Sequence, residues 1–538
     1  MKEKIQVIFP DKIKLPKNIN LPFPINQSEY LIDGELHKWE GEVEEVFSPI
    51  FVKENKSLKN AIGSYPLMDK ETSLKALHAA KTAYNNGQGE WPLMTLKQKI
   101  ECFKNFTLAM KEQRNIVVKL LMWEIGKSLK DSEKEFDRTI EYINDTVEAL
   151  KDLDRNASRP VLTQGIIAQI RRAPLGVVLC MGPFNYPLNE TFTTLIPALI
   201  MGNTVVFKPP KLGVLLHSPL LKAFKDSFPK GVVNTIYGEG QKVVAPLMES
   251  GDVNVLAFIG SCKVADILKK QHPQPHKLKS VLGLEAKNPA IILEDCDLDN
   301  TVKECITGSL SFNGQRCTAL KIIFIHENIK DAFIQKFVSE VEKLIIGMPW
   351  DKNVFITPLP EPNKTEHLSD LVNDAITKGA KLCNPSGGMK NKSFFFPAVL
   401  SEVKENMNIY HEEQFGPIIP IVTFNDIQKP LDYVIHSNYG QQASVFGQNS
   451  KKIAILIDTL VNQVCRVNIN SQCQRGPDVF PFTGRKDSAE GTLSVSDALK
   501  VFSIRTLVAL KENDFNKTIM TDIVQNKDSN FLSTDFIL

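Results

Sequence analysis

Apolar residues along the chain are grouped into short runs separated by stretches of helical periodicity. Several runs are rich in β-branched residues and carry few polar side chains, as expected for strands buried on both faces. They span residues 176–180, 204–207, 233–237, 253–259 and 290–293. Short apolar strands that alternate with helices predict an α/β protein with parallel sheets covered by helices. The last run begins a second strand–helix series that continues to about residue 448.

A helical region precedes the first series of strands. Between residues 70 and 151, apolar side chains recur at the spacing of one helix face, as at Ala76, Ala79 and Ala83. Residues 164–172 alternate apolar and polar side chains, which predicts an exposed strand. The segment after Glu512 is polar and poorly patterned, so we expect a loosely held C-terminal tail.

The composition is ordinary for a globular protein. Of 538 residues, 43% are hydrophobic and 23% are charged, and the net charge is +2. With so little net charge we expect neither nucleic acid nor a membrane as a partner. No apolar run has the length of a membrane span, and the first residues lack the pattern of a signal peptide. We therefore expect a cytoplasmic protein.

The cysteines offer one candidate for chemistry. The chain has nine of them and no C-x-x-C pair, which argues against a zinc site and against a disulfide framework. We expect no bound metal. Cys317 follows Arg316 and an Asn-Gly turn, and a neighbouring cation favours the reactive thiolate. Because most free cysteines are small buried side chains, this pair alone leaves both interpretations open.

The common glycine fingerprint of a dinucleotide site is missing. Gly238-Glu239-Gly240 lacks a third glycine at the required position. Ligands of parallel α/β sheets lie at the carboxyl ends of the strands. Residues 207–211 and 258–261 both follow predicted strands, so both are candidate ligand contacts. The residues alone therefore indicate an α/β enzyme whose layout is compatible with nucleotide binding.

Five short motifs occur in the order and approximate spacing of a known family. They are PFNYP at 183–187, FKP at 207–209, FIGS at 258–261, GQRC at 314–317 and EEQFGP at 412–417. On these motifs the chain resembles the aldehyde dehydrogenase family over roughly residues 30–510. Within that family, Arg316 and the run QRGPDVFPF at 474–482 resemble the non-phosphorylating, NADP-dependent glyceraldehyde-3-phosphate dehydrogenases.

The resemblance implies a Rossmann-like cofactor domain, an α/β catalytic domain and a small β arm for oligomerisation. We expect the NADP-binding domain at residues 1–157 and 173–285, and the catalytic domain at residues 286–490. The arm is expected at residues 158–172 and 491–512, followed by a tail at residues 513–538. Family members pair through this arm, so a homodimer or homotetramer is expected.

The resemblance also implies a catalytic sequence. Cys317 would attack the aldehyde carbon to form a thiohemiacetal, and Asn185 would donate its side-chain amide to the developing oxyanion. Such preorganised donors contribute about 3–4 kcal/mol each. Hydride transfer to the nicotinamide would leave a thioester for water to hydrolyse. Taken alone, Asn185 is typical of a turn residue, so its role depends on the motif.

Two lysines carry the cofactor prediction. Lys208 matches the family lysine that holds a cofactor ribose. Three residues later, where many NAD-using relatives carry a glutamate, this chain has Lys211. An ammonium group attracts the 2′-phosphate of NADP, whereas a carboxylate repels it, so we expect NADP. Further cofactor contacts are expected from Gly260, Ser261, Glu413 and Phe415.

The substrate prediction depends on arginine. Arg138, Arg316 and Arg475, with Tyr186, match positions that hold the substrate phosphate in the resembled branch of the family. Arginine suits phosphate because its planar fork makes two parallel hydrogen bonds. Each arginine singly is typical of a surface residue or a salt bridge. Together they favour glyceraldehyde 3-phosphate, oxidised to 3-phosphoglycerate without inorganic phosphate.

The chain departs from the family at the base for thioester hydrolysis. Aligned on Lys287-Asn288-Pro289, the family glutamate position is Gly283, and a carboxylate stands two residues later at Glu285. Residues i and i+2 of an extended segment point to the same side. We therefore predict that Glu285 reaches the same water, and the alternative is a pairing with a nearby cation and slow deacylation.

Three other functions stay open at this point. The substrate could be another anionic aldehyde, such as a carboxylated semialdehyde, which the arginines also suit. The chain could be a binding protein that keeps the fold but has lost turnover, which the displaced Glu285 would explain. It could also be a cysteine hydrolase that pairs Cys317 with a histidine such as His411.

Overall fold

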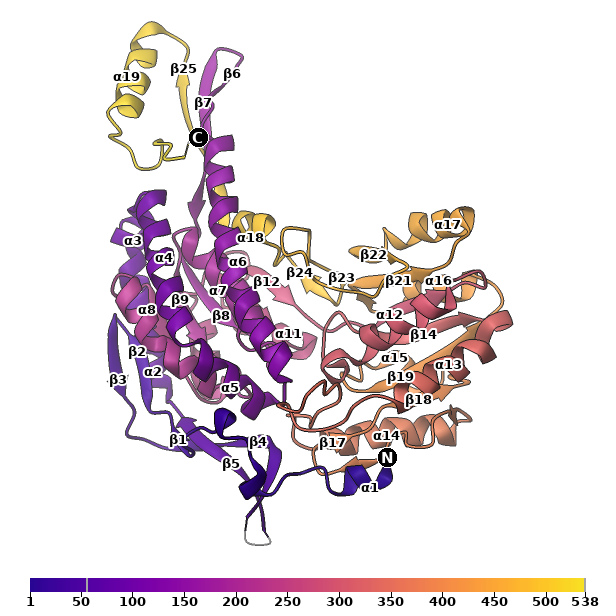
Figure 1. The fold of residues 1–538 in the computed structure, drawn as a ribbon. Coiled ribbons are helices and arrows are strands. Elements are labelled where there is room, and N and C mark those ends of the chain that lie inside the picture. Colours follow the sequence, from indigo (N-terminus) through magenta and orange to yellow (C-terminus); the bar gives the residue numbers. More distant parts are fainter. Residues whose placement is uncertain (55–56, 537–538) are drawn as a thin grey trace.

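The computed structural model describes residues 1–54 and 57–536. The remaining positions fall in the predicted cofactor domain and at the end of the predicted tail, and they lie outside the described residues. The chain forms two α/β units, and a narrow arm projects from the first of them (Figure 1). The predicted fold class is confirmed.

The first unit is built on a six-stranded sheet with the order β10-β9-β8-β11-β12-β24. Its strands are β8 (Val177–Met181), β9 (Thr204–Lys208), β10 (Val233–Thr235), β11 (Val255–Ile259), β12 (Lys279–Gly283) and β24 (Ala489–Glu490). The neighbouring strands β10, β9, β8, β11 and β12 all pair parallel to one another, and β24 joins β12 antiparallel. All five side chains of β8 are buried, which matches its continuous apolar run.

Helices cover this sheet. They include α2 (Lys70–Tyr84), α3 (Glu90–Leu93), α4 (Leu96–Glu112), α5 (Arg114–Ile125), α6 (Leu129–Asn156), α7 (Asn189–Ile200), α8 (Leu221–Ser227), α9 (Gly240–Val243), α10 (Ala245–Glu249) and α11 (Cys262–Gln271). Every residue of α7 is buried, because this helix lies between the sheet and α6. The helical periodicity at residues 70–151 thus corresponds to α2–α6.

The second unit has a seven-stranded sheet with the order β15-β18-β19-β14-β13-β21-β22. Its strands are β13 (Asn288–Ile292), β14 (Leu320–His326), β15 (Lys381–Leu382), β18 (Ala398–Ser401), β19 (Ile418–Phe424), β21 (Gln442–Phe446) and β22 (Arg466–Ile469). Its helices are α12 (Leu298–Leu310), α13 (Lys330–Glu342), α14 (Lys364–Thr377), α15 (Asn408–His411), α16 (Gln428–His436) and α17 (Ser450–Leu460). Residues 284–287 carry the chain directly from β12 to β13, and hence from one sheet to the other.

The amino-terminal region, residues 1–69, packs beside the first unit (Figure 1). It contains α1 (Lys2–Gln6), β1 (Ile25–Asn26), β2 (Glu29–Ile32), β3 (Glu35–Lys38), β4 (Val43–Glu54) and β5 (Ser57–Pro66). β4 pairs antiparallel with β5, and β1 pairs parallel with β5 on its other edge. Short β strands β16 (Lys390–Asn391), β17 (Phe394–Phe395), β20 (Tyr439–Gly440) and β23 (Arg485–Lys486) complete smaller ribbons.

The arm is a three-stranded ribbon of β6 (Val161–Thr163), β7 (Ile166–Pro174) and β25 (Ser503–Lys511). β25 runs antiparallel to β7 from Ser503 opposite Pro174 to Lys511 opposite Ile166.

The structure places two domain boundaries differently from those expected. β24 belongs to the first sheet, and α18 (Val495–Val501) packs against α6 and α7, so residues 489–501 lie in the first unit rather than in the catalytic unit or the arm.

The C-terminal tail is folded onto the arm. After β25, helix α19 (Asp514–Gln525) lies beside the ribbon, and the chain then returns to the root of the arm (Figure 1). Buried Arg171 of β7 holds this return, donating to the Phe531 carbonyl at 2.8 Å and to Asp154 at 2.7 Å. The polar character of the tail did not predict this anchoring, because a single buried arginine provides it.

Among the described residues, none of the helices combines the length and the apolar character that crossing a membrane requires.

Candidate active site

Cys317 follows a tight loop whose backbone is left-handed. α12 ends at Leu310, and Phe312, Asn313 and Gly314 then take φ values of 49°, 56° and 72°. Glycine is required at the third position, because a Cβ there would lie 2.7 Å from the Ser309 carbonyl oxygen. Asn313 fixes the loop through two hydrogen bonds with Thr357, at 3.1 and 3.0 Å. The Asn-Gly turn seen in the sequence thus delivers Cys317 to the start of β14.

Asn185 lies against this loop. It follows β8 in the first unit, is only 4% exposed, and its Nδ2 donates to the Gln315 carbonyl at 2.8 Å. Its own carbonyl accepts a hydrogen bond from Lys127 at 2.7 Å. The amide has a second N–H that remains available for a ligand oxygen. The structure therefore brings Asn185 from one unit to the nucleophile loop of the other.

A buried lysine contacts the backbone of the nucleophile. Lys321 of β14 is 1% exposed, and its Nζ donates to the Cys317 carbonyl at 2.9 Å. The same ammonium pairs with the Glu413 carboxylate, and it lies 5.6 Å from the centre of the Phe415 ring. Lys321 therefore connects Cys317 to Glu413 and Phe415, the two residues of the EEQFGP motif that were expected to contact the cofactor.

A second buried lysine supports the same motif. Lys287 donates at 2.6 Å to both the Glu412 carbonyl and the Gln414 side chain. Burial lowers the pKa of this amine well below its usual range, and the nearby charge of Lys321 adds to the effect. Glu413 also accepts the Ala286 N–H at 3.1 Å. The chain between the two sheets is thus tied to the loop that carries Glu413.

Burial raises the pKa of the Cys317 thiol above its usual range, and the negative charge of Glu190 adds to the rise. The charges of Lys321 and Arg475 act in the opposite direction. Arg316, which the sequence suggested as the activating cation, turns away instead and donates to the carbonyl of Gly308 at 2.9 Å. In this conformation the thiol is protonated at neutral pH.

Two of the predicted substrate arginines converge, and each has a carboxylate partner. Arg138 makes a two-pronged contact with Asp478 at 2.7 and 2.9 Å. Arg475 contacts Asp478 at 3.2 Å and also pairs with Glu190. The cluster of Arg138, Arg475, Asp478 and Glu190 therefore has no net charge when all four groups are ionised.

Arg316 has a different environment. Its guanidinium contacts the carbonyls of Thr307 and Gly308 and the side chain of Gln472. Its buried Nε has no hydrogen-bond partner among the described residues, and no carboxylate within that part of the chain pairs with it. Arg316 and Arg138 lie close enough to Tyr186 for their charges to act on its hydroxyl. Arg316 is thus the predicted anion ligand that keeps an uncompensated charge.

Lys208, the lysine predicted to hold a cofactor ribose, has N–H donors available for a ligand. Burial lowers the pKa of the Lys208 amine to about 8, and its only hydrogen bond among the described residues is a long one of 3.4 Å to the Pro209 carbonyl. Such an amine fits a ribose hydroxyl or a phosphate oxygen. Lys211 is largely exposed and pairs with Glu44, whose carboxylate also accepts the Tyr65 hydroxyl at 2.5 Å. The positive charge of Lys211 is therefore partly compensated.

Glu285 lies at the amino terminus of α11. Its Oε2 accepts the Cys262 N–H at 2.9 Å, beside Ser261, which caps the helix through Val264. Together with burial, this carboxylate raises the pKa of the Cys262 thiol to about 12. Within the described chain Glu285 forms no hydrogen bond with Cys317. The extended segment does not bring this carboxylate to the thiol; it brings it to the helix end next to Gly260.

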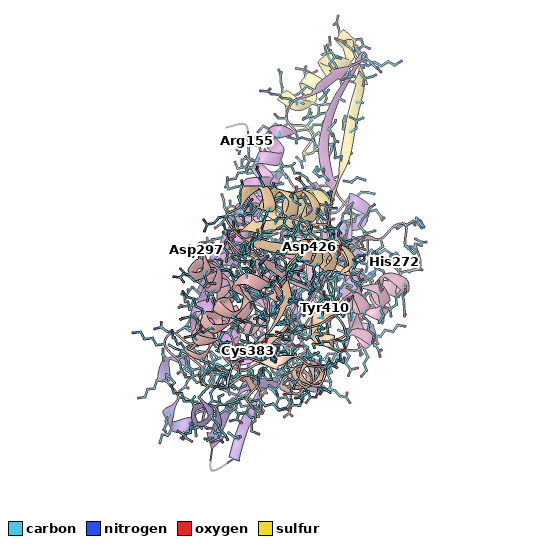
Figure 2. All side chains as sticks on the ribbon, turned by 90° about the vertical axis from the view of Figure 1, so that its right-hand side faces the viewer. Arg155, His272, Asp297, Cys383, Tyr410 and Asp426 are labelled. Atoms are coloured by element: carbon cyan, nitrogen blue, oxygen red, sulfur yellow. The ribbon has the colours of Figure 1, made fainter. Side chains whose placement is uncertain are left out.

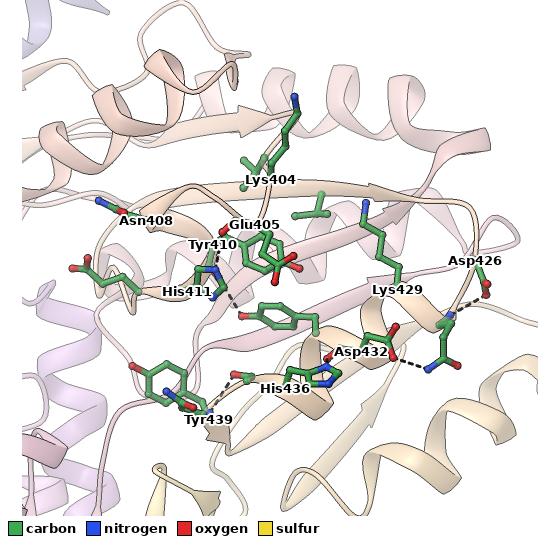
Figure 3. A pocket seen from close by; sticks show the side chains of 17 residues that line it. Lys404, Glu405, Asn408, Tyr410, His411, Asp426, Lys429, Asp432, His436 and Tyr439 are labelled. Atoms are coloured by element: carbon green, nitrogen blue, oxygen red, sulfur yellow. Dashed lines mark hydrogen bonds between the residues drawn. The ribbon is translucent and has the colours of Figure 1, made fainter.

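A separate cavity of about 1090 Å³ lies on the second unit, between α15, β19 and α16 (Figure 3). Tyr410 and Asp426, which line it, also mark this face in Figure 2. His411 belongs to this cavity, and its Nε2 lies 2.7 Å from the Glu405 carbonyl. Cys317 does not line it. The predicted alternative of a Cys317–His411 hydrolase has no support in this arrangement.

Sequence reasoning missed several residues of the site, namely Lys127, Glu190, Lys287, Asn288, Lys321 and Asp478. One of them left a signal. Lys321 interrupts the apolar run of β14, and a charged residue in a strand buried on both faces needs a partner. Asn288, whose amide donates to the Cys317 carbonyl at 2.7 Å, left none, because its role depends on contacts between distant segments.

Comparison with known proteins agrees with this architecture. The model of the "Aldehyde dehydrogenase family" matches residues 47–508. The NADP-dependent glyceraldehyde-3-phosphate dehydrogenase of Streptococcus equinus is 33% identical over 85% of this chain and 93% of that protein. The lactaldehyde dehydrogenase of Methanococcus aeolicus is 31% identical over 74% of this chain and 85% of that protein.

Among solved structures, the NADP-dependent glyceraldehyde-3-phosphate dehydrogenase of Bacillus halodurans in complex with NADP is similar, with a TM-score of 0.81 and 29% identity. The match covers 90% of this chain and 99% of that one. Family match, identity and fold agree over nearly the whole length. The chain belongs to the aldehyde dehydrogenase family and is an NAD(P)-dependent oxidoreductase.

Proposed function

We propose that the chain oxidises glyceraldehyde 3-phosphate to 3-phosphoglycerate with NADP and without inorganic phosphate. The observation that carries this proposal is the position of Arg316. It stands next to the nucleophile in sequence, has no carboxylate partner among the described residues and leaves a buried Nε without a hydrogen bond. A guanidinium in that state favours an anionic substrate. Similarity to dehydrogenases of this substrate supports the choice of aldehyde.

The first step belongs to Cys317 and Asn185. The thiol gives its proton to solvent water, and Sγ forms a bond to the aldehyde carbon as the C=O double bond opens, which places negative charge on the former carbonyl oxygen. The Asn185 amide, held near the loop by its bond to Gln315, donates its free N–H to that oxygen, together with the backbone N–H of Cys317. Because these donors are fixed before the reaction, they lose little energy in reorganising.

The cofactor contacts follow from the lysines and from the EEQFGP loop. NADP supplies the nicotinamide that accepts the hydride. We propose that Lys208 holds a ribose hydroxyl and that Lys211 leaves Glu44 to reach the 2′-phosphate. Glu413 and Phe415, held by Lys321, would position the nicotinamide ribose and ring, while Gly260 and Ser261 approach the cofactor through their backbone.

Hydrolysis of the thioester needs a base, and we retain Glu285 in that role. Its carboxylate now accepts the Cys262 N–H, so it must exchange this bond for a water beside the acylated Cys317. The neighbouring Gly283 carries no side chain, which leaves Glu285 as the carboxylate at the end of the strand. This role is the part of the proposal that mutation tests most directly.

A second candidate is oxidation of another anionic aldehyde, such as a semialdehyde with a carboxylate. The observation that favours it is the pairing of Arg138 and Arg475 with Asp478 and Glu190. With those arginines compensated, Arg316 alone suits a single negative charge rather than the double charge of a phosphate. Similarity to a lactaldehyde dehydrogenase also keeps the choice of aldehyde open.

We also propose that the chain forms a homodimer or homotetramer through the arm. One face of the arm carries exposed apolar side chains, including Leu507 at 56%, Val161 at 50% and Ile166 at 38% exposure. Contiguous apolar surface of this kind is typical of an interface. Sedimentation of the purified protein would measure the oligomeric state, and the variant Leu507→Asp should dissociate it.

The test of the proposed activity is reduction of NADP and of NAD, followed by nicotinamide absorbance without inorganic phosphate. Glyceraldehyde 3-phosphate, succinic semialdehyde and lactaldehyde would be compared at equal concentration. We expect the highest kcat/KM with glyceraldehyde 3-phosphate and NADP. A higher value for the semialdehyde would favour the second candidate. Absence of reduction with every aldehyde would contradict both and support a protein that has lost turnover.

A further inference from the structure

A second cavity lies at the root of the arm, away from the nucleophile. It has a volume of about 550 Å³ and lies where α4, the end of α6, β7 and the C-terminal tail meet. Arg155, labelled in Figure 2, marks this end of α6, and Figure 1 shows the chain returning to the same place. Neither Cys317 nor Asn185 lines the cavity, nor does any predicted substrate arginine.

The lining combines an apolar wall with an excess of positive charge. The apolar wall includes Leu93, Met94, Leu153, Ile170 and Phe531. The charged lining groups are Lys99, Arg159, Arg171, Arg172, Arg505 and Asp154. The single carboxylate, Asp154, is already paired with Arg171 at 2.7 Å. In a protein whose net charge is only +2, this concentration of cations around one cavity is a local feature that needs an explanation.

Two of the arginines face each other across the arm. Arg505 of β25 lies opposite Arg172 of β7 in the antiparallel register, and burial together with the charge of Arg505 lowers the pKa of the Arg172 guanidinium. Like charges directly opposite each other destabilise a strand pair. Within the described part of the chain, Arg172 donates to neutral groups only, among them the Ser503 hydroxyl at 2.7 Å. Among the described residues no carboxylate pairs with Arg172 or Arg505.

Lys99 brings a buried cation to the same place. It is 5% exposed, and its Nζ donates to the Pro92 carbonyl at 3.2 Å. Lys99 and Pro174 both pack against Gly202: a Cβ added to that glycine would lie 3.2 Å from Lys99 Nζ and 3.5 Å from the Pro174 ring. Pro174 is two residues from Arg172 in β7, and such residues point to the same side of a strand. The amine therefore lies on the side of β7 that carries the arginine pair.

Arg171, whose guanidinium holds the C-terminal tail, also has an N–H donor that makes no hydrogen bond with the described residues. Arg171 is 6% exposed, and its Nη atoms bind the tail carbonyls and Asp154. Its Nε, however, is buried without a hydrogen-bond partner among the described residues. A buried donor without a partner is costly, and Arg171, which lines the cavity, adds a polar group to its wall. The facing arginines and the buried Lys99 are the two features that favour an anion in this cavity.

We propose that this cavity binds a small organic anion with an aliphatic body, such as a medium-chain carboxylate. The head group lies among Lys99, Arg172 and Arg505, where it offsets the repulsion between the two arginines. The aliphatic body lies along Leu153 and Phe531. Because Phe531 belongs to the returning tail, the ligand links the tail, the arm and α4.

Isothermal titration calorimetry of the full-length protein with octanoate tests this proposal. We expect octanoate to bind with one site per chain, and 1-octanol and acetate to bind about tenfold more weakly or worse, because each lacks one half of the ligand. Equal binding of 1-octanol, or no binding of octanoate, would overturn the proposal. The latter outcome would arise if acidic side chains of a second copy filled the cavity.

Variants locate the site. Lys99→Met keeps the length of a buried side chain and removes its charge, and Arg505→Gln changes an exposed residue, so both should fold. Each should weaken octanoate binding by about tenfold or more, and Phe531→Ala should weaken it through the apolar wall. Lys111→Met, at an exposed position of the same helix α4, is the matched control and should bind normally. Unchanged affinity in both charge variants would contradict the assignment.

Discussion

Replacing Glu285 with glutamine separates the two roles that this carboxylate can have. The amide oxygen of glutamine still accepts the Cys262 N–H, which Glu285 now binds at 2.9 Å, but it cannot take a proton from water. A general base contributes about 10²- to 10⁴-fold to a rate. If Glu285 is the deacylating base, steady-state turnover should fall by at least about 100-fold, while formation of the acyl-enzyme continues.

The structure also sets the size of the competing, purely structural effect. A carboxylate at a helix amino terminus stabilises it by about 0.3–1 kcal/mol, so Glu285→Gln should lower the free energy of unfolding by no more than that. Asp69→Asn is the matched control, because Asp69 caps α2 through Thr72 at 2.8 Å and is absent from the site. It should show a similar loss of stability with normal turnover.

The assay is stopped-flow absorbance of the reduced cofactor, with mass spectrometry of the quenched protein. For Glu285→Gln we expect a burst of one equivalent per site, a slow phase, and the acyl adduct on Cys317. Adding Gly283→Glu should restore turnover, because a Cβ there lies 3.3 Å from Ile259 and 3.4 Å from Leu493, contacts that small shifts relieve. Wild-type turnover without an accumulated adduct would refute the reasoning for Glu285.

Other substitutions test the remaining contacts. Asn185→Ala should lower kcat by about 10²- to 10³-fold with little change in KM, and an unaltered kcat would exclude the amide as an oxyanion donor. Lys321→Met leaves the Glu413 carboxylate without its buried partner, so the free energy of unfolding should fall by about 3–5 kcal/mol. The control Lys104→Met removes an exposed pair and should cost less than about 1 kcal/mol. Equal losses in urea unfolding would contradict this. Lys321→Met should also shift the alkylation of Cys317 to higher pH, because a cation that lowers the thiol pKa is gone, and the rate at neutral pH should drop relative to wild type. Glu44→Gln frees Lys211 from its carboxylate partner and removes a charge that repels the 2′-phosphate. KM for NADP should therefore fall by roughly fivefold, equivalent to about 1 kcal/mol, while KM for NAD stays unchanged. An equal change for both cofactors would argue against Lys211 as the phosphate contact.

The sequence by itself determined the elements and the nucleophile loop. The runs at 176–180 and 204–207 became β8 and β9, because short continuous apolar runs rich in β-branched residues suit strands buried on both faces. The GQRC motif is contiguous, so its Asn-Gly turn and its cysteine were visible without a fold. Asn185 was predicted only by resemblance, since the contact with Gln315 joins residues far apart in the chain.

Only the tertiary structure decided the state of the charges. Arg138 and Arg475 were predicted as free anion ligands, yet the fold gives them Asp478 and Glu190 as partners. It places Glu285 at the start of α11 rather than at the thiol, and it holds the polar tail through Arg171. The energy of a charge depends on its burial and on partners within a few ångströms, and those partners come from segments that local patterns do not connect.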